Sequence, residues 1–283
     1  MTIKDILTLT KFHLSLTVSI SCAFGYILGN SNLDINILYP FFAVLFLSFG
    51  VCSLNQIQEY KKDSLMQRTQ DRPIPSGRIS YINACLISGF FILLSLFLIY
   101  IIQGLWGIIL FIVVIILYNL LYTNAKKYTI YAGVYGSILG VIPPYIGWIS
   151  NDISIYNIQF FALALFFFVW QIPHFWLLNL EYHKDYEDAG FPTITQQFGR
   201  KSLEKITFIW LNLTLLCGIF LVMTFNVDSL FILTLIIILH IYILYTIFRL
   251  LKYKKYIYNF ININIYMLFL MIIMCINSIF YIN

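Results

Sequence analysis

The sequence predicts an all-α polytopic membrane protein with nine transmembrane helices. Three observations support this fold class: 61% of the 283 residues are hydrophobic, only 10% are charged, and long apolar runs recur from end to end. Soluble domains contain about a quarter charged residues, and a soluble fold of this length could not cover so much apolar surface. The runs are continuous rather than alternating, which indicates helices and not a transmembrane barrel.

Each apolar run is close to the roughly 20 residues that a helix needs to cross a bilayer. The expected spans are residues 13–30, 37–54, 81–102, 105–122, 131–149, 158–180, 203–225, 229–250 and 261–281. The shortest connection is Gln103-Gly104, between the third and fourth spans. We expect residues 1–283 to form a single transmembrane domain. The first run ends without a small-residue cleavage pattern, so we expect no removed signal peptide.

Basic residues are confined to one side of this topology. All 17 Lys and Arg residues lie in the N-terminal arm, in the connections after the second, fourth, sixth and eighth spans, or at the span ends next to those connections, as Lys205 and Arg249 do. The positive-inside rule places these segments in the cytoplasm, and the 150–157 connection on the opposite side. We therefore expect a multi-pass protein of a bacterial inner (plasma) membrane with a cytoplasmic N-terminus.

Acidic residues gather in two short stretches on the same predicted side. Seven of the twelve carboxylates lie there: Glu59, Asp63, Asp71, Glu181, Asp185, Glu187 and Asp188. Cytoplasmic loops are commonly charged, so composition alone also allows ordinary solvated loops. The spacing argues for more than that, because a helix would place Asn55, Glu59 and Asp63 on one face. The second stretch contains a similar set on one face, namely Glu181, Asp185 and Asp188.

Oxygen ligands without Cys or His suit Mg²⁺, which proteins hold with carboxylates together with substrate phosphates. The first acidic stretch is interleaved with bases, namely Lys61, Lys62, Arg68, Arg72 and Arg78. An arginine fork matches pairs of phosphate oxygens. The positive-inside rule explains the sign of these bases but not the interleaved acids. The combination predicts a metal-assisted diphosphate site.

Small residues and prolines interrupt the fifth span. Gly133, Gly136 and Gly140 precede Pro143-Pro144. Glycines at this spacing leave space for a ligand or let two helices pack closely. Both interpretations remain open from the sequence.

Four motifs resemble those of a known family. The run from Asn55 to Pro73 reads N-x-x-x-E-x-x-x-D-x-x-M-x-R-T-x-x-R-P and is similar to the first acidic motif of the UbiA-type intramembrane prenyltransferases. Three later stretches resemble the haem-farnesylating branch of that family, in the same order: Tyr122–Thr129, Ile142–Trp148 and Trp170–Pro192. The chain departs from the family at Thr10-Lys11-Phe12-His13, where Thr-Lys-Pro-Arg is usual, at Lys127, where Arg is usual, and at Pro192-Thr193.

The resemblance implies a UbiA-type helix bundle with a cytoplasmic-side active site. It implies transfer of the farnesyl group of farnesyl diphosphate to a vinyl carbon of haem b, with water addition completing haem O. Mg²⁺ is the implied cofactor. The expected partners are haem b, farnesyl diphosphate, membrane lipid and a downstream haem-modifying enzyme or oxidase, and we expect no nucleic acid.

The resemblance and the residue pattern together assign site residues in three groups. The expected metal ligands are Asn55, Glu59, Asp63, Glu181, Asp185 and Asp188. The expected catalytic residues are Asn55, Glu59, Asp63, Asp185 and Lys126. The expected substrate-binding residues are Arg68, Arg72, Lys127, Lys184, Tyr122, Tyr145, Trp148 and His174. The bases would neutralise the leaving diphosphate, and the aromatic rings would shield an allylic cation.

His174 is the candidate haem contact. At 100° per residue it would share a face of the sixth span with Glu181 and Asp185, and imidazole is a natural ligand of haem iron. Alternatively, His174 only satisfies carbonyls freed by Pro173, and the haem contact is His13 or His183.

Two other functions remain open. The chain could prenylate an aromatic or quinone precursor, although the Trp170–Trp176 run favours haem. It could instead be a membrane transporter, but a transporter would carry ionisable groups at the midplane. His240 is the only ionisable residue well inside an expected span, and a lone histidine there is more often part of helix packing.

Overall fold

The computed structural model describes residues 1–31, 33–151 and 153–281. Every regular element in these ranges is helical. The long helices are α2 (Phe12–Asn30), α3 (Leu38–Asp63), α4 (Tyr81–Ile115), α6 (Ala132–Ile149), α7 (Ile158–Asp188), α9 (Arg200–Thr224), α10 (Leu230–Tyr253) and α11 (Tyr256–Tyr281). The short ones are α1 (Ile3–Leu9), η1 (Ile35–Ile37), the π-helical η2 (Ile116–Tyr122), α5 (Thr123–Tyr128) and α8 (Ile194–Phe198).

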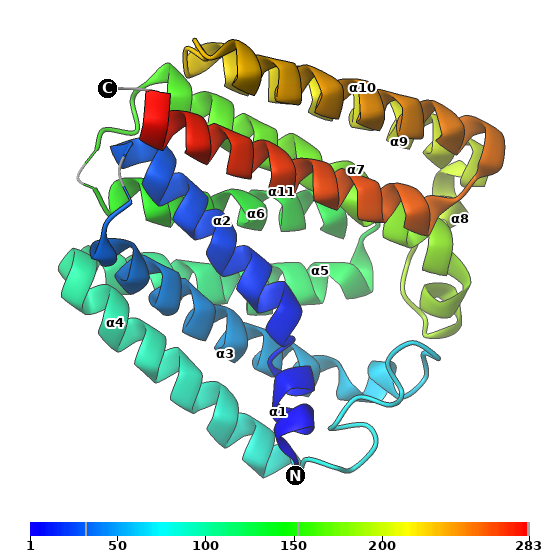
Figure 1. The fold of residues 1–283 in the computed structure, drawn as a ribbon. Helices are drawn as coiled ribbons and strands as arrows, with labels where there is room; N and C mark the ends of the chain where they lie inside the picture. Colours follow the sequence, from blue (N-terminus) through cyan, green and yellow to red (C-terminus); the bar gives the residue numbers. More distant parts are fainter. Residues whose placement is uncertain (32, 152, 282–283) are drawn as a thin grey trace. The chain divides into compact units, whose positions relative to one another are not determined.

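The described helices confirm the all-α membrane fold. Eight helical stretches of the described ranges are long and apolar enough to cross a membrane, and the longest runs from Tyr81 to Tyr128. Gly104 interrupts that stretch with φ 59° and ψ −144°, a conformation essentially reserved for glycine. Figure 1 shows the chain turning back between the α4 and α5 labels. The stretch therefore contains the two limbs that the sequence divides at Gln103-Gly104, and counting them separately brings the described spans to about nine.

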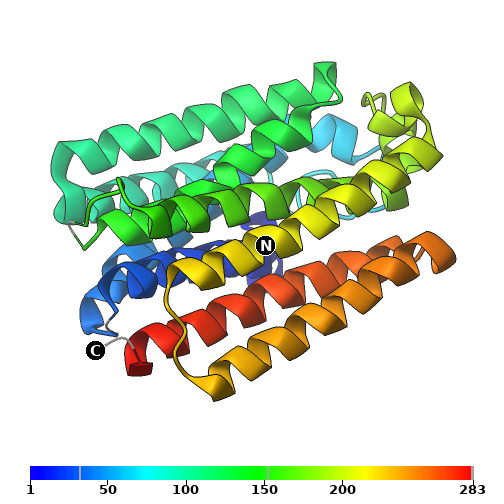
Figure 2. The ribbon, with the colours of Figure 1, turned by 90° about the horizontal axis from the view of Figure 1, so that it is seen from above.

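The chain forms two compact units. The first contains residues 1–23, 35–132 and 184–192, and the second contains residues 24–34, 133–183 and 193–281. In the first unit α3 packs along α4 (Figure 1). In the second, α9, α10 and α11 pack against one another and lie side by side in Figure 2.

The second half of the basic loop between α3 and α4 is anchored to α1. Ile74 and Ile79 are buried in one cluster with Leu9 of α1. Arg78 donates a 2.8 Å hydrogen bond to Asp5, whose side chain also closes a capping box with Thr2. The Arg78 guanidinium lowers the pKa of Asp5 to about 2. The loop is thus held against α1 and is not an independent surface segment.

The glycines of α6 serve helix packing in the second unit. A Cβ on Gly140 would lie 2.6 Å from the Gln171 side chain of α7, and one on Gly133 would lie 3.2 Å from Phe175. A Cβ on Gly25 of α2 would lie 2.0 Å from the carbonyl oxygen of Pro144. These contacts support the packing interpretation of the Gly133–Gly140 spacing, because neighbouring side chains and backbone already fill the space.

Candidate active site

Three polar residues of α3 form the centre of the first unit's polar cluster. Asn55, Glu59 and Asp63 are 1%, 6% and 1% exposed. Their spacing of four residues places them on one face, as the sequence predicts, because α3 continues without a break to Asp63. The Asn55 amide donates to Glu59 Oε2 at 3.0 Å. Burying a carboxylate costs folding free energy unless the carboxylate is paired. The partners of these residues therefore determine whether the cluster is stable.

Each member of this trio has a cationic partner. Lys126 Nζ of α5 lies 2.8 Å from Glu59 Oε1, and Arg72 Nη1 lies 2.7 Å from Asp63 Oδ2. Lys11 Nζ donates to Asn55 Oδ1 at 3.3 Å. Three cations from three separate segments therefore converge on one face of α3.

Lys11 is a site residue that the sequence pattern did not assign. It stands between α1 and α2 with φ 47°, a left-handed conformation that is uncommon for a residue with a side chain. Burial lowers its pKa, and the neighbouring charges of Arg72 and Lys126 lower it further. The Thr10-Lys11 pair of the opening motif was the available signal, but the loss of the following Pro and Arg obscured it.

Lys126 is positioned by the π-helical turn η2. In η2 the Asn119 side chain donates to the carbonyl of Val51 at 3.1 Å, and Thr123 donates to the carbonyl of Tyr118. Such π segments are frequent at functional sites. Lys126 Nζ lies 4.9 Å from the Tyr122 ring centroid, a cation–π distance. Lys127 instead donates to Asn124 at 3.2 Å.

Asp185 holds the basic loop. Its carboxylate accepts the backbone N–H of Gln67 at 2.8 Å and that of Arg68 at 3.5 Å. Arg68 Nη2 donates to Tyr186 at 3.0 Å. The second acidic stretch thus contacts the loop that carries Arg68 and Arg72, and Lys184 and Asp188 are exposed beside it.

The donor atoms for a metal ion are only partly assembled. Within the described residues, no group of three or more His, Cys, Asp or Glu side chains lies close enough to hold a metal ion. However, Asp63 Oδ1 is buried and has no hydrogen-bond partner. An unpartnered carboxylate oxygen beside Asn55 and Glu59 suits a hard cation with oxygen ligands, so this donor set fits Mg²⁺.

The other assigned residues belong to the second unit. Trp148 is buried, donates to the carbonyl of Ser154 at 3.2 Å and packs on Phe160, which also contacts the Tyr145 ring. Trp148 thus joins the end of α6 to the 150–157 connection. Residue 152 of this connection lies outside the described residues. Glu181 is exposed.

His174 has a defined hydrogen bond. Its Nδ1 lies 2.9 Å from Asn264 Oδ1, and its ring lies 4.6 Å from that of Phe260. Tyr182 departs from helical geometry inside α7, with φ −105° and ψ 16°. Because α7 is irregular at Tyr182, His174 and Asp185 do not share a face in the way that a regular helix would place them.

His240 is hydrogen-bonded to its own helix and to α11, as expected for a histidine that takes part in helix packing. Its Nδ1 bonds the carbonyl of Ile236 at 2.8 Å and its Nε2 lies 3.0 Å from the Tyr266 hydroxyl.

Comparison with known proteins identifies the family. The UbiA prenyltransferase family matches residues 18–278. A protoheme IX farnesyltransferase from Oleidesulfovibrio alaskensis is 32% identical over 185 residues, which cover 65% of this chain and 66% of the relative. One from Bartonella bacilliformis is 33% identical over 222 residues, covering 77% and 70%. The chain thus spans about two thirds of the length of these relatives.

A solved structure shares the fold. A UbiA homologue from Archaeoglobus fulgidus, bound to GPP and Mg²⁺, matches with a TM-score of 0.68 at 15% identity, covering 97% of this chain and 99% of the other. The family match, the helical membrane fold and these relatives agree. The chain therefore belongs to the UbiA prenyltransferase family of membrane enzymes.

Proposed function

We propose that this enzyme transfers the farnesyl group of farnesyl diphosphate to a vinyl group of haem b. Water addition then gives haem O, and diphosphate is released. The observation that carries the proposal is the α3 trio, in which two buried carboxylates and a buried amide are each matched by a cation. The names of the similar farnesyltransferases support the choice of substrates.

Ionisation of an allylic diphosphate builds negative charge on the leaving group. Lys11, Arg72 and Lys126 are three cations already held in place beside α3. Preorganised charge of this kind is usually the largest catalytic contribution, and one donor is worth about 2.7–4 kcal/mol. Arg68, in the same loop as Arg72, adds a further guanidinium, which donates to the Tyr186 hydroxyl.

Mg²⁺ would be held by Asn55, Glu59 and Asp63, with Asp185 and Asp188 as further ligands. When bound, the metal ion supplies charge that stabilises the diphosphate leaving group. The carboxylates would then be neutralised by the metal, and Lys126 and Arg72 would be available to the phosphate oxygens. The neighbour solved with GPP and Mg²⁺ supports the use of this metal ion with a prenyl diphosphate.

His174 is proposed to contact the haem acceptor. Asn264 Nδ2 donates to the carbonyl of Phe260 at 2.6 Å, so its Oδ1 faces His174 and accepts the Nδ1 proton. Nε2 then carries the lone pair, which is the tautomer that binds iron. We expect His174→Ala to weaken haem binding and shift the Soret band, with farnesyl diphosphate binding near normal. Unchanged haem spectra would mean that His174 has only a structural role, and would leave His13 and His183 as the candidate haem contacts.

The deciding experiment is an activity assay with purified components. Purified protein, haem b, farnesyl diphosphate and Mg²⁺ should give a product with the mass of haem O, and chelation of Mg²⁺ should stop the reaction. Prenylation of an aromatic or quinone precursor in place of haem b would overturn the acceptor assignment and keep the prenyl transfer.

We also propose that the basic connections face the bacterial cytoplasm.

A further inference from the structure

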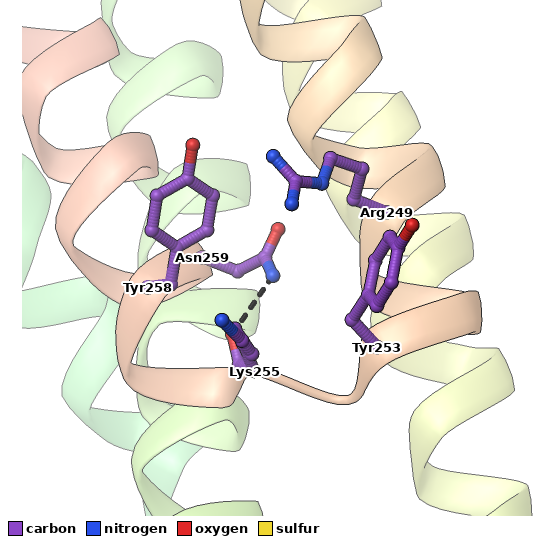
Figure 3. Close-up of a pocket in the computed structure, with 5 residues that line it drawn as sticks. All are labelled: Arg249, Tyr253, Lys255, Tyr258 and Asn259. Carbon is purple, nitrogen blue, oxygen red and sulfur yellow. Dashed lines mark hydrogen bonds between the residues drawn. The ribbon is translucent and has the colours of Figure 1, made fainter.

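A pocket that does not involve Asn55, Glu59 or Asp63 lies where α10 and α11 meet. Figure 3 shows Arg249 and Tyr253 from the end of α10, with Lys255, Tyr258 and Asn259 from the turn and the start of α11. On α11 the residues that contact His174 are Phe260 and Asn264. Tyr258 and Asn259 point away from those two on a helix of 3.6 residues per turn, and Lys255 precedes that helix. The pocket is therefore distinct from the proposed haem contact.

Among the described residues, the two cations of the pocket have no acidic partner. Arg249 and Lys255 form no ion pair within the described part of the chain. The nearby carboxylate, Glu204 of α9, is taken by Lys254 at 3.4 Å and Arg200 at 3.8 Å. The Arg249 guanidinium lies instead 4.9 Å from the Tyr253 ring and 5.9 Å from the Tyr258 ring. An arginine braced by aromatic rings presents its donors to an external anion.

The turn that builds the pocket is fixed. Lys254 adopts a left-handed conformation with φ 50° and caps α10 through the carbonyl of Leu250. Glu204 also accepts the Tyr256 hydroxyl, which ties the start of α11 to α9. Asn259 is 3% exposed and donates to the carbonyl of Lys255 at 2.9 Å. The positions of Lys255 and Arg249 are thus set before any ligand arrives.

The surface next to the pocket is apolar and outward-facing. Ile238, Ile241 and Tyr245 lie on the Arg249 side of α10 and are 58%, 62% and 58% exposed. In a membrane-spanning helix these side chains meet acyl chains. Tyrosines at a helix end are typical of the headgroup level. An anion that binds Arg249 at this position would therefore carry hydrocarbon chains beside it.

We propose that this pocket binds the phosphate of an anionic membrane phospholipid, with the acyl chains lying along α10. Arginine forks and lysine ammonium groups match phosphate oxygens, and basic side chains at the membrane surface favour anionic over zwitterionic lipid. A free phosphate ion shares the headgroup chemistry but would gain nothing from the apolar surface of α10.

Native mass spectrometry of the purified full-length protein tests the proposal. The protein is exchanged into equal amounts of phosphatidylglycerol and phosphatidylcholine, and the bound lipids are counted. We expect phosphatidylglycerol to be retained, and Arg249→Gln to reduce its retention at least tenfold. Lys255→Gln, at an exposed position with little effect on folding, should reduce retention in the same direction. Neither change should alter prenyl transfer under saturating substrate.

The matched control is Lys252→Gln, which removes a charge from the same helix end but not from the pocket. General attraction to an anionic surface is worth about fivefold per charge, so Lys252→Gln should lose no more than that. Equal losses in Lys252→Gln and Arg249→Gln, or equal retention of the two lipids, would overturn the proposal. Release of the lipid by excess inorganic phosphate would assign the pocket to a soluble anion and would also overturn it.

Discussion

At the residue scale, Lys11 shows how one buried charge couples binding to stability. Its ammonium group contacts Asn55 and is surrounded by the charges of Arg72, Lys126 and Glu59. Burial lowers its pKa below the ordinary value of 10.5. Folding therefore disfavours the charged form, and the charge costs stability at neutral pH. That cost disappears as the pH rises through the lowered pKa toward the unfolded value.

We predict that Lys11→Met raises the KM for the prenyl diphosphate while raising the melting temperature at neutral pH. With Lys11 in place, the affinity for the prenyl diphosphate should fall at alkaline pH as the ammonium group loses its proton. Lys11→Arg should keep the affinity and shift this fall to higher pH, because arginine stays charged. The measurements are substrate titrations across pH and thermal unfolding in detergent. Lys4→Met, at an exposed lysine of α1, is the control. A Lys11→Met enzyme with normal KM at every pH would remove Lys11 from the site.

The carboxylates allow a second prediction. Asp63→Asn should lower turnover about 10²- to 10³-fold with little loss of folded protein, because the amide is the same size and still accepts from Arg72. Glu187→Gln should be mild. Steady-state rates of purified variants at matched Mg²⁺ concentrations check both. If Glu187→Gln were as damaging as Asp63→Asn, the α3 trio would not be the metal site.

Asp185→Asn separates two roles of the second acidic stretch. An amide oxygen can still accept the N–H of Gln67, so loop anchoring survives the substitution. A loss of turnover in Asp185→Asn that deepens as Mg²⁺ is lowered indicates a metal ligand. A rate near that of the wild type assigns Asp185 to loop anchoring alone.

The site could be predicted from sequence only where its contacts are local. Asn55, Glu59 and Asp63 share a face because one unbroken helix contains them. The pairing of Lys11 with Asn55 joins positions 44 residues apart, and no periodicity encodes it. The position of Asp185 relative to the loop depends on the irregular backbone at Tyr182, which a regular helical projection cannot anticipate.

At the element scale, hydropathy located the helices but not their ends. The second apolar run stops near residue 54, whereas α3 continues to Asp63, and α7 likewise continues to Asp188. Polar turns beyond the apolar run can remain helical because tertiary partners satisfy them, as Lys126 and Arg72 do on α3. These extensions carry the candidate site residues, and their helical spacing, rather than hydropathy, predicted that the helices continue.

Gly104 is the element-scale prediction. Gly104→Ala should lower the free energy of unfolding by about 1–3 kcal/mol, because its φ of 59° with ψ −144° is strained for any side chain. Gly89→Ala is the matched control. It lies inside α4, its Cβ would meet no atom within 4 Å, and alanine should gain about 0.5–1 kcal/mol in a helix. Denaturant unfolding of both variants is the measurement. Equal stability of the two would mean that the α4 limbs join without a strained turn.

At the scale of the whole molecule, the distribution of charge predicts the orientation of the chain in the membrane. Every Lys and Arg lies at the same end of the expected spans, and the described helices reproduce those spans. The two limbs on either side of Gly104 are needed for this alternation. Were Tyr81–Tyr128 a single crossing, the basic residues after it would fall on the opposite side from those before it. The composition and the break at Gly104 therefore support one topology.

The last prediction tests that topology. We expect the 55–80 and 181–202 connections to face the cytoplasm and the 150–157 connection to face away. In a variant without the five native cysteines, single cysteines at Gln70, Gln197 and Tyr156 would be exposed to reagent, since all three positions are exposed. An impermeant thiol reagent added to intact cells should label only Cys introduced at Tyr156, and permeabilisation should reveal the other two. Labelling at Gln70 from outside would reverse the orientation and place the diphosphate site away from the cytoplasm.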